Sequence, residues 1–294
     1  MTIRSSILIA TFNMKELVGQ AIESCLENIV DSEVVVVDDG SSDGTYDFLR
    51  EAYGHRKNIV IHRFQKNMGK VSAFNKAFSL SSGKTITLLG ADDIVLAGRN
   101  RLIDMVLNNE GLDLGVGSYF IADSEMVIKS YKETRVVLWP RILKENGYPG
   151  GAMVLSRKFA NRIFPINTEI NNEDYIIALN ACFSGNVTVT KESVLSYRRH
   201  SNNTWAGLKV ADRFRKGAER DLLIIDEFKK SQNKFSSEDV MAIEVASSMR
   251  RLIAAPTFLD IIKGVRDMLK YRYSIKILVK SFVVLIYGGA KNGK

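Results

Sequence analysis

Four consecutive valines at residues 34–37 run directly into two adjacent carboxylates, Asp38 and Asp39, and then into a turn over residues 40–45. An unbroken run of β-branched residues is typical of a strand covered on both faces, as in a parallel sheet. Gly, Ser and Asp residues then end the strand and begin a helix that contains residues 46–50. Ligands of open α/β sheets bind beyond the carboxyl ends of such strands, so this turn is a candidate ligand site.

The same turn has a simpler interpretation, in which Ser42 or Asp43 only caps the following helix. A cap uses one polar side chain and leaves the neighbouring pair, Asp38 and Asp39, unexplained. We therefore expect this pair to have a further role at the end of the strand.

A second acidic pair, Asp92 and Asp93, follows a β-rich apolar segment at residues 85–89. Two carboxylates at the end of a buried strand repel each other and lose hydration, and a divalent cation relieves both effects. Mg²⁺ in particular binds one or two carboxylates and takes its other ligands from substrate phosphates and water. The alternative is a solvated turn in which an Asp caps the next helix.

Two further motifs complete the pattern. Residues 6–13 read Ser-Ile-Leu-Ile-Ala-Thr-Phe-Asn, and residues 67–75 read Asn-Met-Gly-Lys-Val-Ser-Ala-Phe-Asn. Together with the two acidic blocks, these motifs resemble in order and spacing those of the family 2 glycosyltransferases of the GT-A fold. The resemblance covers about residues 3–205. Gly90 departs from it, because an Asp is frequent there, so the metal motif has two carboxylates rather than three.

The resemblance implies a role for several residues at the donor. The aromatic equivalent to Phe12 stacks on or borders the uracil in this family, and the carboxylate equivalent to Asp39 accepts from the base or ribose. Asp92 approaches the ribose or donor sugar, and Asp93 binds Mg²⁺ or Mn²⁺, a Lewis acid that stabilises the departing nucleoside diphosphate. A plain core aromatic is the alternative for Phe12. The residues assigned to the nucleotide-sugar are Phe12, Asn13, Asp39, Lys70 and Asp92, with Arg198 and Arg199 from later in the chain.

The acceptor site is expected in the second half of this domain. Residues 147–153 form a glycine-rich turn, and glycines allow a ligand to approach the backbone closely, although a turn alone is also consistent. Asn172, Glu173 and Asp174 precede an apolar helical segment at 175–179. By the resemblance, Asp174 is the general base that deprotonates the acceptor hydroxyl, and Glu173 supports it or contacts the acceptor. The alternative is a helix cap, which is compatible with catalysis.

A late segment, residues 195–203, contains Arg198, Arg199 and His200. Some related enzymes place a His or Arg near the metal or diphosphate, which makes His200 a candidate metal ligand and either arginine a candidate phosphate clamp. A solvated surface loop is the alternative. His55 and His62 lie in no such pattern and are read as structural or exposed.

Charge divides the chain near residue 206. Residues 1–205 contain 23 basic and 23 acidic residues, whereas residues 206–294 contain 18 and 10, so the formal charge of +8 lies in the C-terminal part. Residues 258–270 and 275–286 each have an apolar face beside a lysine-bearing face. Basic amphipathic helices bind anionic membrane interfaces, while packing on the catalytic domain is the alternative. An apolar helix face can also be buried in a homodimer.

Other features limit the class of protein. Cys25 and Cys182 are expected to be buried helix residues and not a disulfide. The N-terminal residues lead directly into a strand and the longest apolar run, residues 282–287, is short, so neither a signal peptide nor a membrane span is expected. We expect a cytoplasmic protein, peripheral on the inner face of the cytoplasmic membrane where its basic segments bind lipid.

Two other nucleotide-binding classes and one partner class do not fit. Residues 10–13 lack the G-x-G-x-x-G of a dinucleotide-dependent dehydrogenase, and Phe78 occupies the first glycine position of a P-loop that would end with Gly83, Lys84 and Thr85. No nucleic acid partner is expected, because aromatic residues do not interleave with a basic patch.

The predicted fold is α/β, with a GT-A type, Rossmann-like mixed sheet flanked by helices. Residues 1–105 form its nucleotide-sugar half, 106–205 its acceptor half, and 206–294 a basic helical extension. The predicted reaction moves a sugar from a nucleotide-diphosphate donor, with a UDP-sugar favoured, to a hydroxyl of a lipid-linked or growing cell-surface saccharide such as lipopolysaccharide or capsule, with inversion. A polyprenyl-phosphate sugar synthase on the same fold and a non-catalytic sugar-nucleotide-binding protein are the alternatives.

Overall fold

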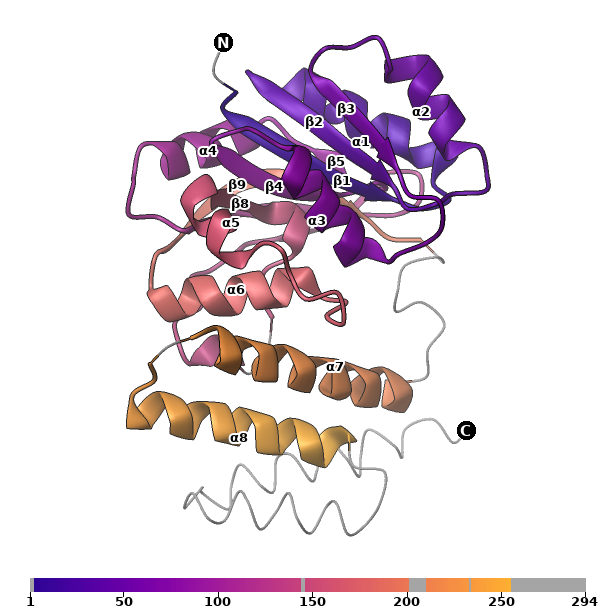
Figure 1. The fold of residues 1–294 in the computed structure, drawn as a ribbon. Coiled ribbons are helices and arrows are strands. Elements are labelled where there is room, and N and C mark those ends of the chain that lie inside the picture. Colours follow the sequence, from indigo (N-terminus) through magenta and orange to yellow (C-terminus); the bar gives the residue numbers. More distant parts are fainter. Residues whose placement is uncertain (1–2, 144–145, 201–209, 233, 255–294) are drawn as a thin grey trace. The chain divides into compact units, whose positions relative to one another are not determined.

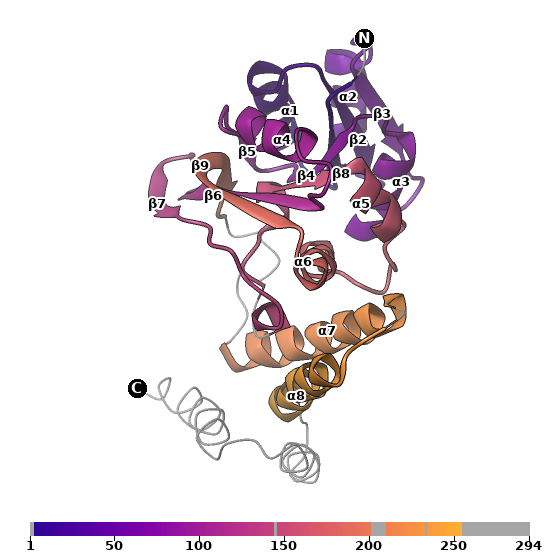
Figure 2. The same ribbon diagram turned by 90° about the vertical axis from the view of Figure 1, so that its left-hand side faces the viewer.

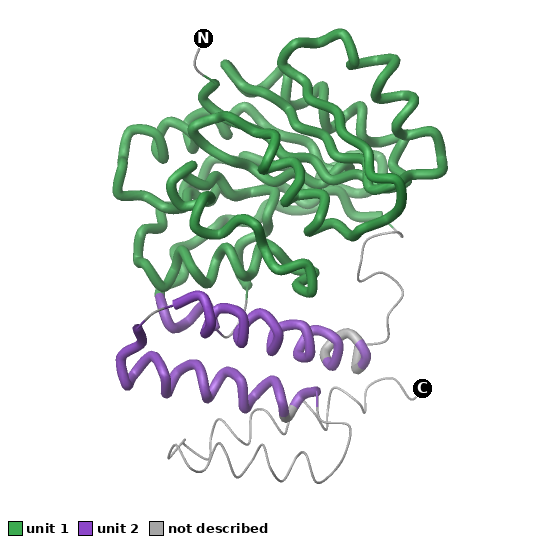
Figure 3. Tube along the Cα trace, viewed as in Figure 1, with its two compact units in different colours: residues 1–138, 146–200 green, residues 139–145, 201–294 purple. Residues whose placement is uncertain are grey.

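The computed structural model of the chain describes residues 3–143, 146–200, 210–232 and 234–254 (Figure 1). They belong to two compact units (Figure 3). Unit 1 comprises residues 1–138 and 146–200, and unit 2 comprises residues 139–145 and 201–294.

Four parallel strands form the first half of the sheet in unit 1, in the order β3-β2-β1-β4. Their bounds are β1 (Ser5–Thr11), β2 (Ser32–Asp38), β3 (Ile59–Arg63) and β4 (Thr85–Gly90). The valines of β2 are fully buried, as their unbroken apolar run predicts. Thr11 lies opposite Asp38, and Ala10 lies opposite Gly90. The segments that follow β1, β2 and β4 therefore begin at one edge of the sheet.

Four antiparallel pairings and the parallel β6–β9 pairing extend the sheet, giving the order β3-β2-β1-β4-β8-β6-β9-β5, with β7 paired to β6. The added strands are β5 (Ile94–Val95), β6 (Leu114–Ala122), β7 (Ile128–Lys132), β8 (Met153–Ser156) and β9 (Val187–Arg198). Strand β9 runs parallel to β6 and places Arg198 opposite Ala122. The mixed sheet confirms the predicted α/β class.

Helices cover both faces of this sheet. Figures 1 and 2 show α1 and α4 on one face and α3, α5 and α6 on the other. The helical segments are α1 (Lys15–Asn28), α2 (Thr45–Tyr53), α3 (Lys70–Leu80), α4 (Arg99–Leu107), α5 (Arg157–Ile163), α6 (Glu173–Ser184) and the 3-10 turn η2 (Gly150–Ala152). Cys25 on α1 and Cys182 on α6 are buried and unbridged, as predicted, and burial raises the pKa of each thiol to about 12.

Asp43 connects the first two helices. Its carboxylate accepts the backbone N–H of Lys15 at 3.1 Å, at the start of α1, and that of Thr45 at 3.0 Å, at the start of α2. Carboxylates at helix N-termini also interact favourably with the helix dipole. Asp43 therefore binds N–H groups at the starts of both helices, although the N-cap residue of α2 is Gly44, and Asp38 and Asp39 take no part in these contacts.

Unit 2 contains α7 (Val210–Ser231), α8 (Ser237–Ala254) and the 3-10 turn η1 (Arg141–Leu143). Trp139 packs against Phe228 with ring centroids 5.5 Å apart, and its indole N–H donates to Asp239 at 2.7 Å. These contacts join Trp139 to α7 and α8 within unit 2. The two basic amphipathic segments at 258–270 and 275–286 lie outside the described residues. No helix within the described ranges is long and apolar enough to cross a membrane.

Arg99 is a fully buried cation at the first position of α4. Its guanidinium donates to the carbonyls of Met153 at 3.0 Å and Val194 at 3.1 Å, and also to that of Gly151. Burial lowers its pKa to about 10, so it remains charged at neutral pH. Arg99 thus joins α4 to η2, β8 and β9 through one side chain.

We expect Arg99→Met to lower the free energy of unfolding by about 3–5 kcal/mol, because it leaves buried carbonyls without donors and removes a buried countercharge. Urea unfolding followed by far-ultraviolet circular dichroism measures the effect. Arg101→Met is the matched control on the same helix, since Arg101 is exposed and pairs with Glu192, and such a pair contributes about 0–1 kcal/mol. Equal losses in the two variants would contradict the role of Arg99.

Candidate active site

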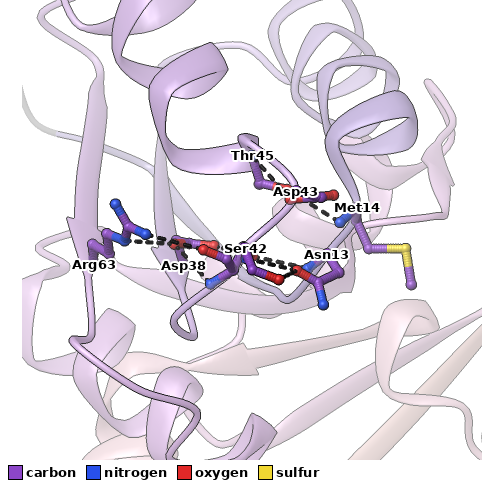
Figure 4. Close-up of polar contacts among 8 residues, drawn as sticks. Asn13, Met14, Asp38, Ser42, Asp43, Thr45 and Arg63 are labelled. Atoms are coloured by element: carbon purple, nitrogen blue, oxygen red, sulfur yellow. Dashed lines mark hydrogen bonds and ion pairs between the residues drawn. The ribbon is translucent and has the colours of Figure 1, made fainter.

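The turn after β2 is held by its own polar side chains together with Asn13, after β1, and Arg63, on β3 (Figure 4). Asp38 is fully buried and accepts from Ser41 N–H at 3.3 Å and from the Ser41 hydroxyl, and it lies 3.4 Å from Arg63 Nε. Asn13 has a left-handed backbone with φ of +52°; its N–H donates to Ser41 Oγ at 2.8 Å and its Oδ1 accepts from Ser42 N–H at 2.9 Å. Asp38 and Asn13 therefore shape the turn, and donor binding by Asn13 stays a prediction.

Asp39 connects this edge to the segment before α3. One carboxylate oxygen accepts from Met68 N–H at 2.6 Å and the other from Gly69 N–H at 2.9 Å. Asp39 is 3% exposed; burial raises its pKa, against the two N–H groups that favour the ionised form. Phe12 is 42% exposed, so the core-aromatic alternative is wrong for it. The nucleotide contacts of Phe12 and Asp39 stay predictions.

The second acidic pair lies in the turn after β4. Asp93 is 4% exposed and its Oδ1 accepts the backbone N–H of Arg198 at 3.0 Å, which rules out a solvated turn. Burial, followed by the repulsion of Asp92, raises the pKa of Asp93 well above its usual range. His200 Nε2 lies 2.9 Å from Asp92 Oδ2. The structure thus brings His200 to the acidic pair, from a point more than a hundred residues later.

The same turn explains the departure at Gly90. A Cβ at this position would lie 2.7 Å from Asp92 Oδ1 and 3.0 Å from Asp93 Oδ2. Any side chain there would displace the two carboxylates as they are arranged here. A glycine in place of a third carboxylate therefore leaves room for the close approach of the Asp92 and Asp93 carboxylates.

Arg198 is buried and binds protein groups. Its guanidinium donates to the carbonyl oxygens of Asp92 at 2.8 Å and Ser124 at 2.6 Å, and to Gln20 Oε1 at 2.6 Å. Arg199 is exposed, and its backbone N–H donates to the Ala122 carbonyl at 2.9 Å. The structure therefore gives Arg198 a part in holding the acidic turn. A phosphate clamp at either arginine stays a prediction.

The candidate base lies at the start of α6. Glu173 is 5% exposed and its Oε1 is 2.9 Å from Lys70 Nζ. Burial opposes the charge of this ammonium, but the carboxylates of Glu173 and Asp174 outweigh it and raise the pKa of Lys70. Asn172, the N-cap residue, makes no side-chain cap hydrogen bond. The cap alternative therefore does not hold for Asn172.

Two adjacent glycines connect the base to the acidic pair. A Cβ on Gly150 would lie 3.4 Å from Asp174 Cβ, and a Cβ on Gly151 would lie 3.5 Å from Asp93 Oδ2. The backbone of η2 therefore passes close to both carboxyl-bearing residues. Side chains at these two positions would take up space beside Asp93 and Asp174.

Two residues of this region, Tyr197 and Arg99, were not identified from the sequence. Tyr197 is half-buried on β9, and burial and the Asp93 and Asp92 carboxylates raise its pKa, while Arg199 and Lys70 oppose the shift. Residues 195–198 belong to strand β9 and not to a loop. The alternation of side chains along this strand is therefore the sequence signal that could have identified Tyr197. Arg99 carried a different signal, because a cation in the first turn of a helix opposes the helix dipole and has to be explained by tertiary contacts.

The acidic turn suits a metal bound partly by substrate. Carboxylate oxygens and imidazole are suitable ligands for Mn²⁺, and a cation would offset the repulsion between Asp92 and Asp93. Among the described residues, no group of three or more His, Cys, Asp and Glu side chains is arranged to hold a metal ion. The residues therefore fit an ion that takes several ligands from phosphate and water.

Sequence comparisons identify related proteins. Residues 6–146 match the model of the family described as Glycosyl transferase family 2. A UDP-Glc:alpha-D-GlcNAc-diphosphoundecaprenol beta-1,3-glucosyltransferase of Escherichia coli, WfgD, is 27% identical over 186 residues, which cover 62% of this chain and 71% of WfgD. The succinoglycan biosynthesis protein ExoU of Rhizobium meliloti is 33% identical over 118 residues, 40% of this chain and 32% of ExoU.

Solved structures show the same fold at low sequence identity. Residues 1–349 of S. aureus TarS match with a TM-score of 0.63 and 14% identity over 91% of this chain and 80% of that one. The mannosyltransferase PcManGT from Pyrobaculum calidifontis, in complex with GDP-Man and Mn²⁺, matches with a TM-score of 0.59 and 17% identity, covering 99% and 87% of the two chains. The ordered motifs, the mixed sheet and these matches show that residues 6–146 belong to glycosyltransferase family 2 and that the chain has the GT-A fold.

Proposed function

We propose that this protein is an inverting glycosyltransferase that moves a sugar from UDP to a hydroxyl group of a lipid-linked saccharide. The observation that carries the proposal is the Gly150–Gly151 turn, which passes close to Asp93 at one residue and to Asp174 at the next. The donor and the acceptor can therefore both bind beside this turn. WfgD, which is named for a UDP-Glc donor and a diphosphoundecaprenol-linked acceptor, supports the substrate classes.

The donor's nucleoside is assigned to the edge beyond β1 and β2. The exposed ring of Phe12 offers a face for the base, and stacking of this kind contributes about 1–3 kcal/mol in nucleic-acid complexes. Asp39 has acceptor capacity beyond its two backbone hydrogen bonds, because each carboxylate oxygen has more than one acceptor site. A TarS structure in complex with UDP-GlcNAc is consistent with a UDP-sugar on this fold.

The diphosphate is assigned to the acidic turn. Asp93, with Asp92 and His200 beside it, would hold Mn²⁺ or Mg²⁺, which stabilises negative charge on the departing diphosphate. His200 and Asp92 fix each other's position through the 2.9 Å contact between Nε2 and Oδ2. Arg199 is exposed and is the arginine we assign to the phosphates, because Arg198 already donates to three protein groups.

The acceptor is assigned to the space beside η2 and the start of α6. Asp174 accepts the proton of the acceptor hydroxyl, and a single displacement by that oxygen inverts the anomeric carbon. A phosphate acceptor needs no such base, and the neighbouring Glu173 and Asp174 carboxylates would repel it. This charge pattern favours a hydroxyl acceptor over the lipid phosphate of a polyprenyl-phosphate sugar synthase.

A lipid-linked acceptor would bring the reaction to a membrane surface. We therefore propose a peripheral enzyme of cell-surface polysaccharide assembly. An enzyme of this kind turns over its donor, and turnover distinguishes it from a sugar-nucleotide-binding protein without catalysis.

We expect UDP with Mn²⁺ to raise the thermal stability of the protein more than GDP, dTDP or CMP do, and we expect Asp93→Asn to abolish the metal-dependent part of the shift. A ligand at a hundredfold excess over its Kd adds about 2.7 kcal/mol of stability. Differential scanning fluorimetry with and without Mn²⁺ measures this, with Asp47→Asn on the exposed face of α2 as control. A larger shift with GDP would reassign the donor, and no shift with any nucleotide would remove the donor site.

We expect Asp174→Asn to lower kcat by about 10²- to 10⁴-fold, because the amide cannot accept the acceptor proton. The Kd for UDP should change by less than about threefold, since the base does not contact the nucleotide. Turnover is measured with a UDP-sugar panel and GlcNAc-diphosphoundecaprenol, and calorimetry gives the Kd. Glu169→Gln, an exposed carboxylate before α6, is the control. A wild-type protein that binds UDP and transfers no sugar would support the non-catalytic alternative.

A further inference from the structure

Lys70 lies between the segment that meets the nucleotide edge and the helix that carries the candidate base. It is the first residue of α3, it directly follows Gly69, and its ammonium contacts Glu173 at the start of α6. We propose that Lys70 is a positioning residue, through which the donor-side segment at 67–69 sets the geometry of Glu173 and Asp174. This inference rests on the proposed function and assigns Lys70 a role different from binding the donor phosphates.

The donor end of this connection is fixed by backbone hydrogen bonds. Asp39 binds the N–H groups of both Met68 and Gly69, and Gly69 N–H is also 3.1 Å from Asn67 Oδ1. Gly69 has a φ of +91°, a conformation that side-chain-bearing residues rarely adopt. The position at which α3 begins therefore follows the position of Asp39.

The acceptor end is fixed by charge. The Glu173 carboxylate is buried; one oxygen lies 2.9 Å from Lys70 Nζ, and its other oxygen, Oε2, is buried without a hydrogen-bond partner in the described structure. An ionised buried carboxylate requires a countercharge, and removing that partner is costly. Lys70 is the cation that contacts it here. Because Asp174 is the next residue on α6, a change in the position of Glu173 would also move the proposed base.

Two further contacts join α3 to the segment that leads into α6. Asn75 donates to the Ile166 carbonyl at 2.7 Å and accepts from the Ile166 N–H at 2.8 Å. The rings of Phe78 and Phe164 stack with centroids 4.4 Å apart. Figures 1 and 2 show α3 and α6 on the same side of the sheet. The segment is therefore held along the length of α3, which makes this helix a rigid connection.

The two roles for Lys70 predict different kinetic changes. A donor-phosphate ligand contributes to binding, so its loss would raise the donor Kd. A positioning residue acts on the base, so its loss would lower kcat and leave the donor Kd unchanged. A misplacement of a catalytic group by about 1 Å costs on the order of a hundredfold in rate.

The test uses the full chain with Lys70→Met, Lys70→Arg and Lys76→Met. Lys76 is on the same helix and its removal controls for the loss of a positive charge. We expect Lys70→Met to lower kcat by about 10- to 100-fold with the Kd for UDP and Mn²⁺ within about threefold of wild type. Lys70→Arg should keep most of the turnover, and Lys76→Met should match wild type. Calorimetry gives the Kd and single-turnover assays give the rate.

A rise in the Kd of about tenfold or more at unchanged kcat would identify Lys70 as a donor ligand and overturn the inference. Wild-type behaviour of Lys70→Met would also overturn it. If Lys70→Met fails to fold, the Lys70→Met/Glu173→Gln double variant removes both charges, and we expect its kcat to equal that of Glu173→Gln alone. If the fold-losses of kcat in the two single variants instead multiply in the double variant, the proposed connection between Lys70 and Glu173 is contradicted. Failure of the proposed function is distinguishable, because the wild-type protein would then neither bind UDP nor transfer sugar.

Discussion

The carboxyl groups of Asp38, Asp39 and Asp93 are buried at one edge of the sheet in unit 1, and each of them is bound or faced by groups from other segments of the chain. Asp38 is bound by Ser41 and lies against Arg63, and Asp39 binds the two N–H groups before α3. Asp93 accepts from the backbone of Arg198. A buried charge without such partners is strongly unfavourable, so the carboxylates determine where the surrounding segments lie.

This requirement connects the architecture to the chemistry of the family. The compensating groups come from the turn after β2, the end of β3, the segment before α3 and the end of β9, so binding these carboxyl groups brings together segments far apart in sequence. Glycines occur at several positions where carboxyl groups lie close to the backbone. Gly90 leaves room for Asp92 and Asp93, and Gly150 and Gly151 leave room for Asp174 and Asp93. The glycines thus keep open the space that the proposed reaction needs.

Sequence pattern was most successful where one local signal was sufficient. The valine run predicted a buried parallel strand, and both acidic pairs were placed correctly at strand ends. The sequence pattern was less informative where the direction of a side chain decides which groups it binds. Arg198 and Arg199 were both candidate phosphate clamps, and in the structure the guanidinium of Arg198 donates to protein groups of Asp92, Ser124 and Gln20. Its neighbour Arg199 is exposed, and no local signal separates two adjacent arginines.

The sequence by itself determined the family, the α/β class and the residues that bear the acidic chemistry, because strand periodicity and turn residues act locally. Only the tertiary structure decided which of these groups meet. The contact between His200 and Asp92, the pairing of Lys70 with Glu173 and the three carbonyls bound by Arg99 each join residues separated by more than fifty positions. Such contacts depend on strand order and register, which place distant segments at one edge of the sheet and which no single segment encodes.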